Sequence, residues 1–211
     1  MAGGRRWSGR LLRGLEFVAY PATAGAAGAL LAVGIVTWLP ALAATARGLQ
    51  DWRTDGETRL FRAVLRAFAR YRRTLLPHSA TGLAAAVLLA ANLYFLSGRT
   101  GLAAFALFFG QVGILALFVL YHLAVAVCAA RDPDGTPARW RRAALAFAFG
   151  APSRGLGLLA TAAAAPILTV VLPLGPILFG ASIPLLYGLY LADRLDADTA
   201  PRARTRQGST R

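Results

Sequence analysis

Lysine is absent from this chain, and charge of either sign is scarce. All 23 basic residues are arginine, nine residues are acidic, and charged residues make up 15% of the 211 residues. Soluble domains carry about 25% charged residues. Hydrophobic residues make up 57%, and the mean hydropathy is +0.54. This composition points to a protein embedded in a lipid bilayer, and arginine without lysine is typical of a GC-rich bacterial genome.

Cysteine and histidine are nearly absent as well. The single Cys128 excludes an internal disulfide and a multi-cysteine metal site. His78 and His122 are the only histidines, which excludes the HExxH motif and a histidine-rich zinc cluster. No serine lies in a GxSxG motif, and no glycine-rich loop ends in lysine. We therefore expect a protein that is not an enzyme and that uses no cofactor or metal.

The net charge of +14 is also found in nucleic-acid-binding proteins, whose clustered basic residues neutralise phosphates. Here the arginines lie between long apolar runs instead of on one soluble face. We therefore expect no nucleic acid as a partner. The lipid bilayer is the expected environment.

Four uncharged stretches are long enough to cross the hydrocarbon core, which takes about 20 residues of helix. They cover residues 17–46, 74–98, 100–130 and 155–192. The last is too long for one span, and the sequence Pro173-Leu174-Gly175-Pro176 predicts a turn near its middle. The expected spans are residues 18–36, 79–96, 102–128, 155–172 and 177–192, with a short or re-entrant helix at 37–49.

The arginines indicate the orientation, because arginine near the ends of spans stays cytoplasmic. Residues 1–16, 47–73, 131–154 and 193–211 carry net charges of +3, +5, +3 and +2, and only Arg99 lies elsewhere. A single crossing by residues 17–46 would put the first two segments on opposite sides. A hairpin that enters and returns keeps every basic segment inside, and we favour it over the single crossing.

The sequence thus predicts an all-α fold: a polytopic transmembrane bundle of about five to six membrane helices in hairpins. It forms one domain over residues 1–195, followed by a disordered cytoplasmic tail at 196–211. Both termini are expected on the cytoplasmic side of a bacterial inner membrane, in a multi-pass arrangement.

A basic amphipathic helix is predicted over residues 58–76, in the cytoplasm or at the membrane interface. Its arginines recur at spacings of three and four, which places them on one face. This face could dock an acidic partner or anionic lipids, whereas the plainer interpretation, which we favour here, is a topological anchor. The arginines of the face are Arg59, Arg62, Arg66, Arg70 and Arg73.

Few polar residues lie within the predicted spans. Asn92, Gln111 and His122 could line a site, although hydrogen bonds between helices are the more usual role of such residues. None of the nine acidic residues lies in a span, which disfavours an ion-coupled carrier but not an uncoupled one. The small residues Ala24, Gly28 and Ala32 form a seam suited to close helix packing, on this chain or another.

Several short motifs resemble the YesL-like family of small bacterial membrane proteins. They are Gly34-Ile35-Val36-Thr37, Gly56-Glu57, Phe61, Phe68, Arg70-Tyr71 and Asn92-Leu93-Tyr94-Phe95, within a similarity over roughly residues 15–195. The chain departs from the family pattern at Asn92, where an acidic residue is expected, and at Trp38-Leu39-Pro40, in place of Ile-Gly. The resemblance implies an accessory role beside carbohydrate uptake systems of the ATP-binding-cassette (ABC) type, and it implies no particular site residues.

Three functions remain open at this point. The favoured one is a non-enzymatic accessory subunit or factor that associates with a membrane transporter subunit. The second is an uncoupled small-solute transporter or channel, for which the break at residues 173–176 could form a half-helix binding site. The third is a membrane enzyme acting on lipid or envelope material, for which the acidic cluster Asp51, Asp55 and Glu57 is the only candidate and is typical of a solvated loop.

Overall fold

The computed structural model describes residues 3–171 and 173–208, and within these ranges it is entirely helical. Eight helices are present in the described residues, joined by short turns. They are α1 (Gly3–Ala32), α2 (Trp38–Asp55), α3 (Leu60–Ser97), α4 (Leu102–Arg131), α5 (Pro137–Phe149), α6 (Pro152–Val171), α7 (Gly175–Phe179) and α8 (Ser182–Gly208).

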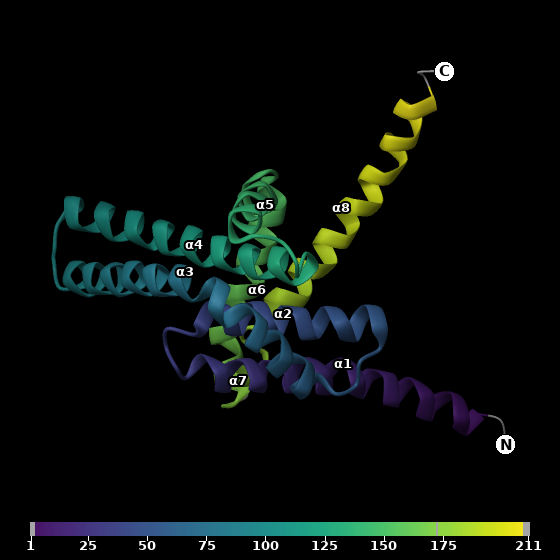
Figure 1. Ribbon diagram of the computed structural model, residues 1–211. Helices are drawn as coiled ribbons and strands as arrows, with labels where there is room; N and C mark the ends of the chain where they lie inside the picture. Colours follow the sequence, from purple (N-terminus) through teal and green to yellow (C-terminus); the bar gives the residue numbers. More distant parts are fainter. Residues whose placement is uncertain (1–2, 172, 209–211) are drawn as a thin grey trace.

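The two longest apolar helices, α3 and α4, form a hairpin that projects beyond the rest of the molecule (Figure 1). The predicted amphipathic helix at 58–76 and the span at 79–96 are parts of the single helix α3, which continues through Pro77. The start of α1 and the end of α8 both point away from the hairpin tip (Figure 1). The molecule therefore has a packed base, from which the hairpin extends.

The core of the base surrounds α2, which contacts α1, α3, α4 and α8. Alanine dominates the buried positions of α2, and its small side chain lets several helices approach closely. Larger apolar side chains from the neighbouring helices fill the remaining space around it. The largest of them that are fully buried are Leu60, Val64, Tyr71, Leu75, Leu158, Leu185 and Leu189.

The predicted hairpin of a span and a return helix is present, but its boundaries differ. The first helix ends at Ala32 instead of residue 36, and the return helix extends to Asp55 instead of ending at residue 49. Gly56 ends α2 in the left-handed conformation (φ 67°), where its N–H donates to Trp52 O and the N–H of Glu57 donates to Asp51 O. The charged residues after Leu49 therefore extend the helix instead of forming a loop.

The turn between α1 and α2 lies beside the middle of the hairpin and not near its tip. The indole N–H of Trp38 donates to Ser79 O at 3.2 Å, and the N–H of Leu39 donates to the Ser79 hydroxyl at 3.3 Å. From Ser79 to Ser97 the hairpin continues for about 27 Å at the rise of an α-helix. The α1–α2 turn therefore lies well short of the hairpin tip.

Helix α5 was not predicted, although the sequence contains its signals. The Thr136 side chain accepts a hydrogen bond from the N–H of Arg139, and Pro137 follows at the first helical position. The buried face repeats at helical spacing, with Trp140, Ala144, Phe147 and Ala148. The five arginines of residues 131–154 indicate a cytoplasmic segment, but their charge alone does not indicate a helix.

The span predicted at 177–192 lies within Gly175–Ala197, which is apolar and long enough to cross a membrane, although α7 ends at Phe179 and α8 begins at Ser182. Pro184 explains the break: it has no N–H to donate to Gly180 O, so it fits the first turn of a new helix better than the middle of one. The structure also differs from the predicted disordered tail at 196–211, because α8 continues through alanine and arginine to Gly208. Residues 209–211 lie outside the described residues.

Four helical segments among the described residues are long and apolar enough to cross a membrane. The number is five if the α5–α6 pair, which is bent by 97°, is counted as one broken span. Within the described residues, the all-helical fold with several helices long and apolar enough to span a membrane is thus confirmed. The four segments are Leu15–Ala32, Leu60–Ser97, Leu102–Arg131 and Gly175–Ala197, and α2 is not among them.

Candidate functional site

The arginine row on α3 is exposed along its whole length. The side of the helix that carries Leu60, Val64, Tyr71 and Leu75 is buried against the base, which turns the arginines outward. All five predicted residues lie on this exposed side: Arg59, Arg62, Arg66, Arg70 and Arg73.

The acidic residues near the row engage only part of it. Arg66 pairs with Glu57 at 3.2 Å, and Arg70 lies 3.7 Å from Asp134. The N–H of Arg59 donates to the Glu57 carboxylate, and this bond, together with Arg66, lowers the pKa of Glu57. Within the described part of the chain, Arg62 and Arg73 have no ion pair, so the middle and the end of the row offer uncompensated positive charge.

The apolar face of the same helix segment divides in two. Leu60, Val64, Tyr71 and Leu75 pack into the base, whereas Phe61 and Leu65 stay exposed at 44% and 41%. At 100° per residue, Phe61 and Leu65 lie between the buried side and the arginine row. The exposed surface of α3 therefore presents an apolar stripe next to a basic one.

A second set of arginines forms ion pairs inside the base. Arg53 pairs with Asp193 at 2.7 Å, and Arg131 lies 3.3 Å from the same carboxylate and also pairs with Asp196. Arg47 pairs with Asp51 at 2.8 Å. Burial raises the pKa of Asp51, and the adjacent Arg47 offsets part of this effect. These ion pairs join α2, α4 and α8.

The C-terminal end of α4 is capped by side chains from three other helices. The Tyr71 hydroxyl donates to Ala129 O at 2.8 Å, Arg47 donates to Ala130 O at 2.9 Å, and the Trp140 indole donates to Asp132 O at 2.8 Å. These carbonyls lack partners within their own helix, and a cation is favoured beside them. The capping residues therefore fix α2, α3 and α5 around one helix end.

The three polar residues predicted within the spans do not form one site. Asn92 and Gln111 line the same cavity, which has a volume of about 300 Å³ and lies between the two helices of the hairpin. His122 is buried elsewhere, where its ring stacks on His78 with centroids 5.4 Å apart and lies 4.8 Å from the Trp38 ring. Its Nδ1 donates to Phe118 O at 2.8 Å. The pairing of the two histidines was missed, because 44 positions separate them in the sequence.

The small-residue seam on α1 packs against this chain. A side chain at Gly28 would place its Cβ against the Thr45 hydroxyl of α2, and one at Gly25 would meet the Leu178 carbonyl of α7. Ala24 is fully buried and Ala32 is half-buried at the end of the helix. The seam therefore brings α1 close to α2, within the same chain.

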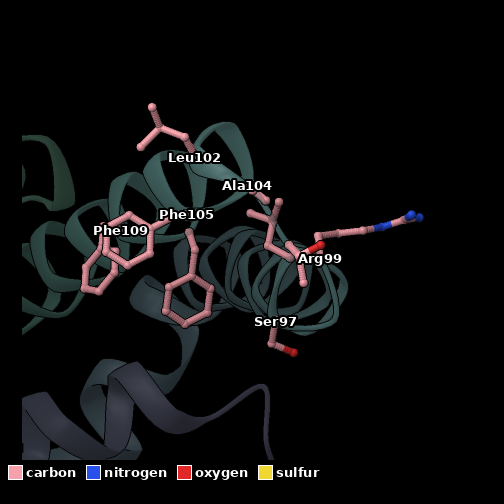
Figure 2. A pocket seen from close by; sticks show the side chains of 10 residues that line it. Ser97, Arg99, Leu102, Ala104, Phe105 and Phe109 are labelled. Carbon is pink, nitrogen blue, oxygen red and sulfur yellow. The ribbon is translucent and has the colours of Figure 1, made fainter.

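A second cavity, of about 710 Å³, lies at the tip of the hairpin. Figure 2 shows Phe105 and Phe109 on one side of it, while the Arg99 side chain extends away from them. The Arg99 guanidinium lies over the Phe95 ring at 4.5 Å. The cavity is therefore open and largely apolar, with Arg99 among its lining residues.

Within residues 3–171 and 173–208, no group of three or more His, Cys, Asp or Glu side chains could hold a metal ion. No protein-family model, curated protein or solved structure matches the chain. The surfaces described above are therefore the observations on which a function can be proposed.

Proposed function

We propose that this chain is a non-enzymatic accessory protein of the bacterial cytoplasmic membrane, and that its arginine row docks on an acidic surface of a transporter subunit. The observation that carries the docking role is the exposed row on α3, of which Arg62 and Arg73 have no acidic partner among the described residues. The identity of the transporter, an ABC-type carbohydrate uptake system, rests on the YesL-like resemblance alone.

The proposed topology follows from how far each of the two hairpins reaches along the direction of α3. Residues 74–97 of α3 extend about 36 Å, enough for a hydrocarbon core of about 30 Å. The α3–α4 hairpin then crosses the membrane with Arg99 on the outer side. The α1–α2 turn lies beside Ser79, about 27 Å short of the tip, so α2 is a re-entrant helix that does not reach the outer face. The N- and C-termini are cytoplasmic.

The docking role is tested by gentle solubilisation of native membranes and identification of what co-purifies with the tagged chain. A permease or ATPase subunit recovered in stoichiometric amount is the expected result. The triple variant Arg62→Gln, Arg66→Gln and Arg70→Gln should then lose most of this subunit, because each arginine contributes charge complementarity to the contact.

The control is a second triple variant with the same change in charge: Arg72→Gln, Arg141→Gln and Arg142→Gln. These arginines are exposed and lie off the row. Equal loss of the partner in both triple variants would show a general charge effect and would contradict the assignment to the row. A partner retained in full by the first variant would remove the docking role.

Uncoupled transport is the second candidate, and the interrupted helices favour it. The α5–α6 pair bends by 97°, and α7 and α8 are separated by a break. Broken helices expose backbone groups that bind substrates in many transporters. Purified protein in liposomes should then carry small sugars without an ion gradient, and the absence of flux across a panel of sugars would leave only the accessory role.

A further inference from the structure

An apolar cavity of about 740 Å³ lies among α1, α6, α7 and α8, in the base of the molecule. Val18, Pro21, Phe179, Ile183 and Leu186 are among the side chains that line it, and Arg53 of α2 contributes a charged group. A volume of this size falls within the range of about 300–1,000 Å³ in which proteins hold small ligands. None of the functions proposed above uses this cavity.

The Arg53 guanidinium is only partly satisfied within the protein. Its Nη2 donates to Asp193 at 2.7 Å, whereas its Nη1 is buried without a hydrogen-bond partner. Asp193 is shared with Arg131, which lies 3.3 Å away. Arg131 also pairs with Asp196, so the unmet need is at Arg53 alone, and a buried cationic N–H group without an acceptor is costly. An anionic oxygen in the cavity would supply the missing acceptor.

The opening of the cavity combines exposed apolar side chains with charged groups. Phe17 and Val18 are exposed at 66% and 55%, beside the charged groups of Arg53 and Asp193. Tyr187 and Tyr190 also line the cavity, and the Arg194 guanidinium lies over the Tyr190 ring at 4.7 Å. Tyrosine and arginine beside exposed apolar side chains suit an amphipathic ligand, which has one apolar and one charged part.

We propose that this cavity binds an anionic phospholipid, with an acyl chain along the apolar lining and the phosphate on Nη1 of Arg53. The apolar walls favour an acyl chain, and the unpartnered cationic Nη1 of Arg53 favours a negative headgroup. This site is separate from the arginine row on α3, and the proposal does not depend on the docking role.

The test is a titration of the purified full-length protein in neutral detergent, with lipid binding followed by native mass spectrometry. Phosphatidylglycerol is compared with phosphatidylcholine carrying the same acyl chains. We expect one phosphatidylglycerol molecule to bind about tenfold more tightly than phosphatidylcholine, because only the former brings a net negative charge to Arg53. Equal binding of the two lipids would overturn the proposal.

Two variants examine the two halves of the site. Arg53→Gln removes the charge and should weaken phosphatidylglycerol binding about tenfold, whereas Arg53→Lys should retain part of it. Ile183→Trp fills the apolar part, leaves the ion pairs intact and should weaken both lipids. If Arg53→Gln does not fold, Ile183→Trp decides, and unchanged lipid binding in that variant overturns the proposal.

Arg62→Gln is the matched control, since it removes an exposed arginine outside the cavity. It should leave phosphatidylglycerol binding unchanged, and an equal loss in this variant would assign the lipid to the general positive charge of the surface. Excess inorganic phosphate distinguishes the two sources of the anion. Displacement of the lipid by inorganic phosphate would indicate a free-phosphate site and would overturn the acyl-chain assignment.

Discussion

The base of the molecule and the outer part of the α3–α4 hairpin bury their apolar surface in different ways. In the base, Arg47, Arg53 and Arg131 bind backbone carbonyls or carboxylates, and alanine allows several helices to surround α2. In the part of the hairpin beyond Ser79, many apolar side chains are exposed, and polar groups are few. Burial inside the protein therefore stabilises the base, whereas the outer hairpin depends on the surrounding lipid for the burial of its apolar surface.

The largest expected effect contrasts two glycines, one in each region. Gly28→Leu places a side chain against Thr45 in the base, whereas Gly110 of the hairpin has open space around its Cβ position. Overpacking should lower the melting temperature of Gly28→Leu by about 5–10 °C, and Gly110→Leu by less than about 2 °C. Thermal unfolding in detergent measures both, and similar losses would break the distinction between base and hairpin.

A smaller effect is expected from one hydroxyl group. Tyr71→Phe removes the buried hydrogen bond to Ala129 O and should cost about 1–2 kcal/mol of unfolding free energy. Tyr94, at 84% exposure in the hairpin, provides the control. Tyr94→Phe should change the unfolding free energy by less than about 0.5 kcal/mol. Chemical denaturation measures the unfolding free energy of both variants. Equal losses of unfolding free energy in the two variants would refute the capping role of Tyr71.

The smallest effect is expected for Gln111 in the hairpin. Its Oε1 atom is buried without a hydrogen-bond partner, so replacement by an apolar side chain of similar size removes an unsatisfied group. Gln111→Leu should therefore leave the unfolding free energy within about 0.5 kcal/mol of the original or raise it. A loss above about 1 kcal/mol would show that Gln111 makes a hydrogen bond that holds the hairpin together.

Much of the fold was predictable because uncharged length and charge spacing report directly on helices in lipid. The segment 102–128 differs little from α4, and the arginine spacing placed five exposed residues on one face of α3. The end of α2 was not predictable from hydropathy, because charged residues continue the helix. Arg47 pairs with Asp51 within α2, and Arg53 pairs with Asp193 of the distant helix α8. A single sequence contains no record of those distant partners.

The candidate sites were predictable only in part, for the same reason. The row on α3 is a local pattern with a period that can be read along the sequence. The pairing of His78 with His122, and the meeting of Arg53 with Asp193 beside an apolar cavity, join residues far apart in the chain. Their proximity depends on how the hairpins pack, and hydrophobic periodicity does not specify that.

The claim that the α3–α4 hairpin crosses the membrane while the α1–α2 turn does not can be tested most directly by cysteine labelling in intact cells. In a Cys128→Ala background, Thr100→Cys at the tip should react with a membrane-impermeant maleimide from outside. Arg62→Cys should react only after permeabilisation, and Ile35→Cys in the α1–α2 turn should not react from outside. Labelling of Ile35→Cys in intact cells, or of Thr100→Cys and Arg62→Cys from the same side, would contradict this arrangement.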